Sequence, residues 1–149
     1  MSSLSGMPAP ASGRLGYCIK LAQHALRIQI DDAMRPLGIT APQFAVLVAV
    51  DCDPGISNAS LARAAFVTPQ TMQGIVANLE RDGFLKRRAD PQHGRILRSE
   101  LTRRGRGVLE RAYLIVAGIE AKMTRSLDRE EVDQLSALLQ RCVDNLLQE

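Results

Sequence analysis

Apolar residues recur at helical spacing along most of the chain, and their pattern predicts six helices and one short hairpin. The first helix is expected over residues 14–37, with apolar stripes on two sides. Three shorter helices follow and end near residue 82. Beyond Gly83 the pattern becomes extended, so residues 84–88 and 95–101 are expected to pair as strands. A long helix over residues 103–126 and a last helix that ends near residue 147 complete the prediction.

Residues that can cap helices stand at the expected helix starts. A side-chain oxygen at the N-cap accepts an N–H group that the first turn leaves without an intrahelical partner. Thr40 and Gln43 are spaced as a capping box, and Gly83 suits the position just after a helix end. The other expected N-caps are Ser57, Thr68, Thr102 and Asp128. Two short helices joined by a tight turn and followed by a hairpin are the order of a winged helix-turn-helix.

Charge is distributed unevenly, although the net charge is only +3. Between Arg81 and Arg111 there are ten basic and four acidic residues, whereas residues 128–149 carry a net charge of −4. Arginine outnumbers lysine 16 to 3, and a guanidinium fork matches the geometry of a phosphate. The basic segment contains the predicted hairpin, so its expected partner is a polyanion, with an ordinary solvated face as the alternative.

The expected fold is therefore mainly α-helical with a small β-hairpin wing. We assign residues 38–102 to a winged helix-turn-helix DNA-binding domain, and residues 14–37 and 103–149 to a helical dimerisation region. The first helix and the last two helices are too apolar to stand alone, which predicts a twofold homodimer. Residues 1–13 are expected to form a flexible tail.

The composition excludes several classes of protein. Aromatic residues make up 3% of the chain and tryptophan is absent, which argues against a stacking platform for single-stranded nucleic acid. No stretch approaches the roughly 18 apolar residues of a membrane span, and the first residues lack a signal-peptide pattern, so a cytoplasmic protein is expected. Three dispersed cysteines and two histidines supply few metal ligands, so neither a metal nor a cofactor is expected. The sequence contains no spacing of nucleophile, base and carboxylate that would indicate an active site, so an enzyme is not expected.

The chain resembles the MarR family, the multiple-antibiotic-resistance-type regulators, over nearly its whole length after the tail. The resemblance is most specific over residues 57–105 and rests on the order and spacing of short phrases. These phrases are Leu37-Gly-Ile-Thr40, Gln43-Phe-Ala-Val-Leu47, Ser60-Leu-Ala62, Leu79-Glu-Arg-Asp-Gly83, Arg87-Arg-Ala-Asp-Pro91 and Leu101-Thr-Arg-Arg-Gly105. The resemblance implies a dimeric winged-helix transcription regulator, usually a repressor. Its partners would be a double-stranded operator with an inverted repeat and, often, a small aromatic or phenolic effector.

The fourth helix is expected to present a polar face to the major groove of DNA. Met72, Val76 and Leu79 should hold its other face on the core. Amide side chains can bind adenine edges, threonine can contact a thymine methyl, and the N–H groups near Pro69 suit a phosphate. In the wing, Arg95 matches the arginine that enters the minor groove in the family. The expected DNA contacts are Thr68, Pro69, Gln70, Thr71, Gln73, Gly74, Asn78, Arg88, Arg95 and Arg98.

The sequence departs from the family at the two DNA-reading elements. Positions 73 and 74 commonly carry threonine and arginine, but this chain has Gln73 and Gly74, so the fourth helix has no arginine before Arg81. The wing tip reads His93-Gly94-Arg95 where Asp-x-Arg-Arg is usual. An operator sequence therefore cannot be taken over from the family.

An effector site is implied between the dimerisation helices and the DNA-binding lobe. An arginine or histidine beside apolar residues can hold a carboxylate or phenolate, and the alternative is a solvated stripe on the first helix beside core aromatics. The candidate residues are Tyr17, His24, Arg27, Phe44 and Tyr113. Cys18 is a redox candidate, although a thiol on an apolar stripe is usually inert packing. A thiol-based redox-sensing regulator and a dimeric protein-interaction module that does not bind DNA thus stay open as alternatives.

Overall fold

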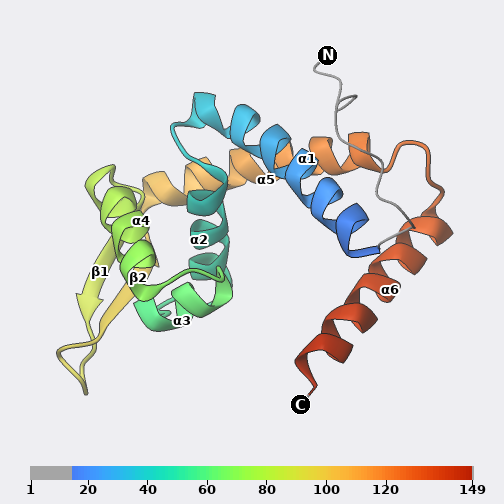
Figure 1. Cartoon of the computed structure of the whole chain (residues 1–149). Helices are drawn as coiled ribbons and strands as arrows, with labels where there is room; N and C mark the ends of the chain where they lie inside the picture. Colours follow the sequence, from blue (N-terminus) through green and yellow to red (C-terminus); the bar gives the residue numbers. More distant parts are fainter. Residues whose placement is uncertain (1–14, 149) are drawn as a thin grey trace.

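The structure of the protein is a computed structural model that describes residues 15–148 (Figure 1). As predicted, the fold is mainly α-helical with one antiparallel hairpin in the described part of the chain. The elements are α1 (Leu15–Met34), the 3₁₀ helix η1 (Arg35–Leu37), α2 (Ala41–Cys52), α3 (Asn58–Ala64), α4 (Pro69–Arg81), β1 (Leu85–Ala89), β2 (Leu97–Leu101), α5 (Arg103–Met123) and α6 (Arg129–Leu147). The predicted tail, residues 1–13, lies outside the described residues.

The predicted N-caps are confirmed at every helix for which the sequence named one. In the capping box, the Gln43 N–H donates to Thr40 Oγ1 at 3.3 Å, and the Thr40 N–H donates to Gln43 Oε1 at 2.9 Å. Asp128 forms a second such box with Glu131. The remaining N-caps that accept a backbone N–H are Ser57, Thr68 and Thr102. Each capped helix therefore begins where the sequence placed it.

Two helix ends were predicted too late. α1 ends at Met34, and residues up to Leu37 form a tighter 3₁₀ turn, because Pro36 lacks the N–H that another α-helical turn would need. α5 ends at Met123 rather than near residue 126. There the hydroxyl and the N–H of Thr124 both bond to the Glu120 carbonyl and close the last turn.

The hairpin is shorter than predicted at its second strand, which begins at Leu97 instead of residue 95. The Asp90 N–H donates to the Ile96 carbonyl at 2.8 Å, so the turn takes up the residues before Leu97. β1 pairs with β2 from Leu85 opposite Leu101 to Ala89 opposite Leu97. The segment before α3 adds two backbone hydrogen bonds to β2, which fasten the hairpin to the helices.

The hydrophobic core lies under α2, α3, α4, the hairpin and the first half of α5. Met72, Val76 and Leu79 are buried in it, as predicted for the inner face of α4. Figure 1 shows these elements as a lobe at one end of α5, with α1 lying along α5 and α6 extending away from its far end. α4 and the hairpin, the two elements predicted to contact DNA, thus lie together on one lobe.

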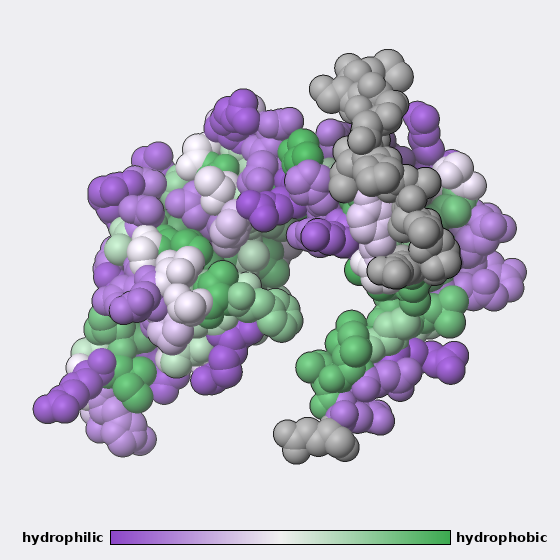
Figure 2. Space-filling model, viewed as in Figure 1, coloured by the Kyte–Doolittle hydropathy of each residue, from purple (hydrophilic) through white to green (hydrophobic). Residues whose placement is uncertain are grey.

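Apolar side chains on α1 and α6 remain uncovered in the protomer. Met34 is the single buried residue of α1, and no residue of α6 is buried. In Figure 2 the hydrophobic side of α6 faces the hollow between that helix and the rest of the chain. Its exposed large apolar residues are Leu135, Leu138, Leu139, Val143, Leu146 and Leu147. This face is called the α6 apolar face below.

Among residues 15–148, no single helix has the length and hydropathy needed to cross a membrane. One pair, the residues of α1 with η1 and those of α2, meets that criterion jointly, but the two parts are bent by 80°.

Candidate DNA-binding surface and effector site

The start of α4 is held by its own threonines. Thr68 Oγ1 accepts the Thr71 N–H at 3.1 Å, and the Thr68 hydroxyl donates to Thr71 Oγ1 at 2.9 Å. Pro69 occupies the first helical position, where the missing N–H would have had no intrahelical acceptor. The two threonines therefore orient each other, and both remain exposed.

The outer face of α4 is polar, exposed and uncharged before Glu80. Every residue in and before α4 that was predicted to contact DNA is exposed, namely Thr68, Pro69, Gln70, Thr71, Gln73, Gly74 and Asn78. Residues 57–79 contain no carboxylate, and Arg63 is their one cation. A polyanion can therefore approach α3 and α4 without electrostatic repulsion.

Asp90 organises the turn of the wing. Its Oδ1 accepts the N–H groups of Gln92 at 2.8 Å and His93 at 3.0 Å, and its Oδ2 accepts Nε–H of Arg98 at 2.8 Å. The Arg98 hydrogen bond, helped by the two backbone N–H groups, lowers the pKa of Asp90 to about 2. Arg98 also donates from Nη1 to the Gly55 carbonyl at 3.2 Å. Its guanidinium, predicted to contact DNA, is thus already engaged in anchoring the wing.

The other arginines of the wing fall into two groups. Arg87 donates from Nε at 2.8 Å and from Nη2 at 2.6 Å to Glu80 Oε2, which fastens β1 to α4. The Arg88 side chain is 65% exposed, and its Nε lies 3.6 Å from Glu100 Oε2. Arg95 is exposed at the wing tip and takes part in no ion pair with the described part of the chain. Arg88 and Arg95 are therefore the wing arginines best placed to reach a ligand.

A notch of about 370 Å³ joins α4 to the wing. Gln73 and Arg95, one from each predicted DNA-contacting element, line it together with Asn58 of α3. Asn58 Nδ2 donates to the Pro69 carbonyl at 3.2 Å, while its buried Oδ1 has no hydrogen-bond partner among residues 15–148. Asn58 was absent from the predicted contacts, and its only sequence signal is its place after the N-cap Ser57.

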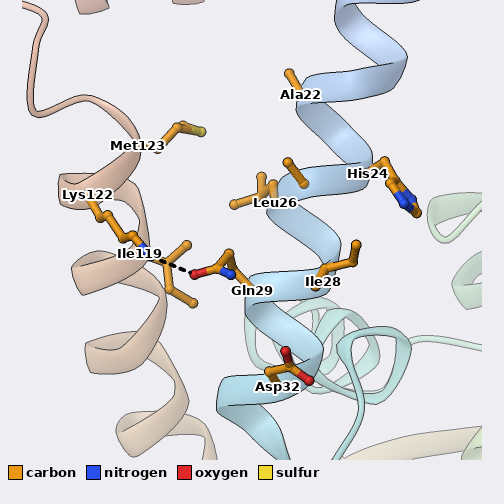
Figure 3. Close-up of a pocket in the computed structure, with 10 residues that line it drawn as sticks. Ala22, His24, Leu26, Ile28, Gln29, Asp32, Ile119, Lys122 and Met123 are labelled. Atoms are coloured by element: carbon orange, nitrogen blue, oxygen red, sulfur yellow. Dashed lines mark hydrogen bonds between the residues drawn. The ribbon is translucent and has the colours of Figure 1, made fainter. Parts of the chain in front are cut away.

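A groove of about 670 Å³ borders α1 and α5 (Figure 3). Leu26 and Gln29 project from α1 towards α5, and Lys122 Nζ donates to Gln29 Oε1 at 2.9 Å. His24 projects from the other side of α1. Of the five predicted effector residues, all of which the structure describes, His24 alone borders this groove.

Phe44 and Tyr113 meet between α2 and α5. Their rings stand edge to face with centroids 5.9 Å apart. The Tyr113 hydroxyl donates to Asp51 Oδ2 at 3.5 Å. Burial, and then the negative charge of Asp51, raises the pKa of Tyr113. This phenol is therefore protonated at neutral pH and can donate a hydrogen bond.

Arg27 lies at the junction of α1 and α2. Its Nε is 3.7 Å from Asp31 Oδ2, and Asp31 Oδ1 accepts the Ala41 N–H at 2.8 Å. The cation thus stands near the first turn of α2, which also carries Phe44. Tyr17 is half-buried on α1, seven residues before His24. The five predicted effector residues are distributed over these places and do not line one cavity.

The cysteines are dispersed. Cys18 and Cys52 are exposed and Cys142 is half-buried. The packing expected for Cys18 on an apolar stripe is therefore not formed within the protomer. No group of three potential metal ligands occurs in the described part of the chain.

The MarR family model matches residues 37–96. The chain is 35% identical over 127 residues to the HTH-type transcriptional repressor Rv2887 of Mycobacterium tuberculosis. The alignment covers 85% of this chain and 91% of that protein.

Solved structures of similar proteins agree with this match. Rv2887 in complex with salicylic acid has a TM-score of 0.73 and 34% identity, and the alignment covers 90% of this chain and 99% of that one. Rv2887 in complex with DNA has a TM-score of 0.73 and 32% identity, over 88% of this chain and 98% of that one. A mutant of Escherichia coli MarR in complex with operator DNA has a TM-score of 0.79 and 26% identity, over 86% and 92% of the two chains. The fold, the polar outer face of α4 beside a basic wing, and these relatives show that the chain belongs to the MarR family of transcriptional regulators.

Proposed function

We propose that the chain is a homodimeric, sequence-specific DNA-binding repressor that a small aromatic ligand releases from its operator. Residues 38–102 form the DNA-binding domain, and residues 14–37 and 103–149 form the dimerisation region. The protein acts in the cytoplasm, without a cofactor and without catalytic activity.

One observation carries the DNA-binding proposal: Gln73 of α4 and Arg95 of the wing line the same notch. A helix that enters the major groove and a wing tip that enters the minor groove must stand side by side to bind one duplex. The amide of Gln73 can bind an adenine edge, and Arg95 can enter a narrow minor groove. Relatives crystallised with DNA add support.

The α6 apolar face supports the homodimer. A helix with a hydrophobic stripe and no buried residue gains little stability in its own protomer. A twofold partner that supplies the same faces of α1, α5 and α6 would cover it. The two α4 helices would then sit in successive major grooves, about 34–36 Å apart along an inverted repeat.

The residues proposed to bind the effector are Arg27, His24, Phe44 and Tyr113, together with Tyr17 near the start of α1. A small aromatic acid could place its carboxylate near the cation of Arg27 and its ring near Phe44 and Tyr113. Rv2887, a relative of similar length, is seen with salicylic acid. Binding there would change the angle between α1 and the DNA-binding lobe, and a coupling of about 1–3 kcal/mol is enough to weaken operator binding substantially.

Selection of bound duplexes from a random DNA library, read at two salt concentrations, tests the proposal. An enriched inverted repeat is the expected result, and its affinity should fall when salicylate is added. Salt-sensitive binding without a motif would indicate a non-specific architectural protein. Absence of binding at either salt would favour the protein-interaction module.

The redox alternative has one observation in its favour, the exposure of Cys18. Operator binding measured before and after peroxide, in the wild type and in Cys18→Ser, separates it from the ligand-released repressor. Loss of binding in the wild type alone would support thiol sensing. Equal binding in all four samples would reject it.

A further inference from the structure

Phe66, in the turn between α3 and α4, combines two features that are unfavourable for an isolated protein. Its φ of 56° is the one positive φ of a non-glycine residue in the described part of the chain. Its side chain is 94% exposed. A bulky side chain is sterically disfavoured in the left-handed region, and an exposed phenyl ring gains nothing from burial.

The backbone of the turn explains the positive φ but does not explain a phenylalanine. The Phe66 N–H donates to the Arg63 carbonyl at 3.2 Å, and the Val67 N–H donates to the Ala62 carbonyl at 3.1 Å. These two bonds form a Schellman motif at the end of α3, in which the residue at the position of Phe66 adopts the left-handed conformation. Glycine is the usual residue there because it has no Cβ. A glycine would make the same turn without strain. A contact with a molecule outside the protomer must therefore account for the ring.

The place of Phe66 indicates what that partner is. Phe66 lies two residues before Thr68, the N-cap of α4, and two residues of chain span at most about 7 Å. The ring is therefore within reach of whatever contacts the first turn of α4. The surrounding residues 57–79 contain no carboxylate, which suits a polyanion.

We propose that Phe66 is a DNA-contacting residue whose ring covers an apolar part of the operator, either a thymine methyl or a neighbouring deoxyribose. This proposal rests on the proposed function. Residues 69–79 of α4 carry no charge, so contacts of this part with bases are neutral ones. The thymine methyl is the apolar group that the major groove displays. An aromatic ring offers a large rigid area for such a contact.

The experiment compares two variants of the full-length protein on the duplex that the wild type selects from a random library. Phe66→Gly removes the ring and the strain, whereas Phe66→Ala removes the ring and keeps the strain. Both should bind the duplex about tenfold more weakly for each half-site, the loss expected for an uncovered aromatic contact. In thermal unfolding, Phe66→Gly should be at least as stable as the wild type and more stable than Phe66→Ala. If the two variants lose the same affinity but differ in stability, the loss of affinity is caused by the missing ring and not by a change in the fold.

Replacing thymine by uracil in the duplex distinguishes the two possible DNA contacts. If the ring covers a methyl group, uracil weakens the wild type more than it weakens either variant. If it covers a deoxyribose, uracil changes the affinity of the wild type and of both variants by the same factor, while the variants remain weak.

Wild-type affinity in Phe66→Gly would overturn the inference. A shift of the oligomeric state in Phe66→Gly, measured by sedimentation with DNA affinity unchanged, would overturn it in favour of a protein contact. A wild type that selects no duplex would reject the proposed function itself, so the two failures are distinguishable.

Discussion

Replacing Gly105 with alanine tests how closely α5 is seated against the hairpin. A Cβ at this position would lie 2.0 Å from the carbonyl oxygen of Phe84 and 2.9 Å from its carbonyl carbon. A carbon–oxygen contact needs about 3.3 Å. Both neighbours are backbone atoms, so no side chain can rotate away. The start of α5 and the segment before β1 must therefore separate by more than about 1 Å.

The hydrogen bonds of Thr102 set the size of the effect. Its N–H donates to the Phe84 carbonyl at 3.1 Å, and its Oγ1 lies 2.6 Å from the Gly83 carbonyl and 3.2 Å from that of Phe84. The hydroxyl has one proton to share between the two carbonyls, so separation weakens the equivalent of two hydrogen bonds, at about 1 kcal/mol each. Alanine returns about 1 kcal/mol through its higher helix propensity. Looser packing of the buried Phe84 ring adds a further loss of about 1 kcal/mol. The expected net loss in the free energy of unfolding is about 2 kcal/mol.

Urea unfolding of the full-length protein at one fixed protein concentration measures this loss. Gly107→Ala is the matched control, because a Cβ there meets nothing within 4 Å on the same helix. The control should gain about 0.5–1 kcal/mol. A Gly105→Ala variant as stable as the wild type would refute the reasoning, and so would an equal loss in the control.

Three further predictions concern the DNA-binding surface. Arg95→Ala should weaken binding to every duplex and reduce the slope of log affinity against log salt by about 1, and an unchanged slope would contradict a phosphate or minor-groove role. Gln73→Ala should change the preference at particular base pairs, whereas a uniform loss in a library selection would make it a backbone contact. Because the pKa of Asp90 is lowered from 3.8 to about 2 in the fold, its contribution to stability is complete above pH 3.8 and is lost as the pH falls through about 2. Following the wing amides by NMR during acidification checks this, and Asp90→Asn should remove the transition.

The helix starts were predictable because capping is local. The Thr40 capping box and the Thr68 N-cap each involve residues within four positions, so the sequence contains the whole interaction. The hairpin was predictable in existence but its second strand was placed too early. The bond between Asp90 and Ile96 that closes its turn depends on loop geometry, which residue type does not determine.

The residues of the candidate site that depend on one helix were predictable from the sequence, whereas those that depend on contacts between distant segments were not. The polar face of α4 follows from period and burial, which are properties of one helix. The hydrogen bond of Arg98, a predicted DNA contact, to the Gly55 carbonyl was not predictable, because the two residues are 43 positions apart. The tight turn between α3 and α4 was predicted, but its left-handed residue was not, since a glycine would have marked that position and a phenylalanine does not.

The α6 apolar face has a consequence for how much protein a cell must contain. If covering this face supplies a large part of the folding free energy, folding and association become one equilibrium, and dilution alone favours the unfolded chain. The midpoint of thermal unfolding then rises with protein concentration. Each newly made chain becomes a stable reader of DNA only after it has met a second one, so the occupancy of the operator rises more steeply than the amount of protein.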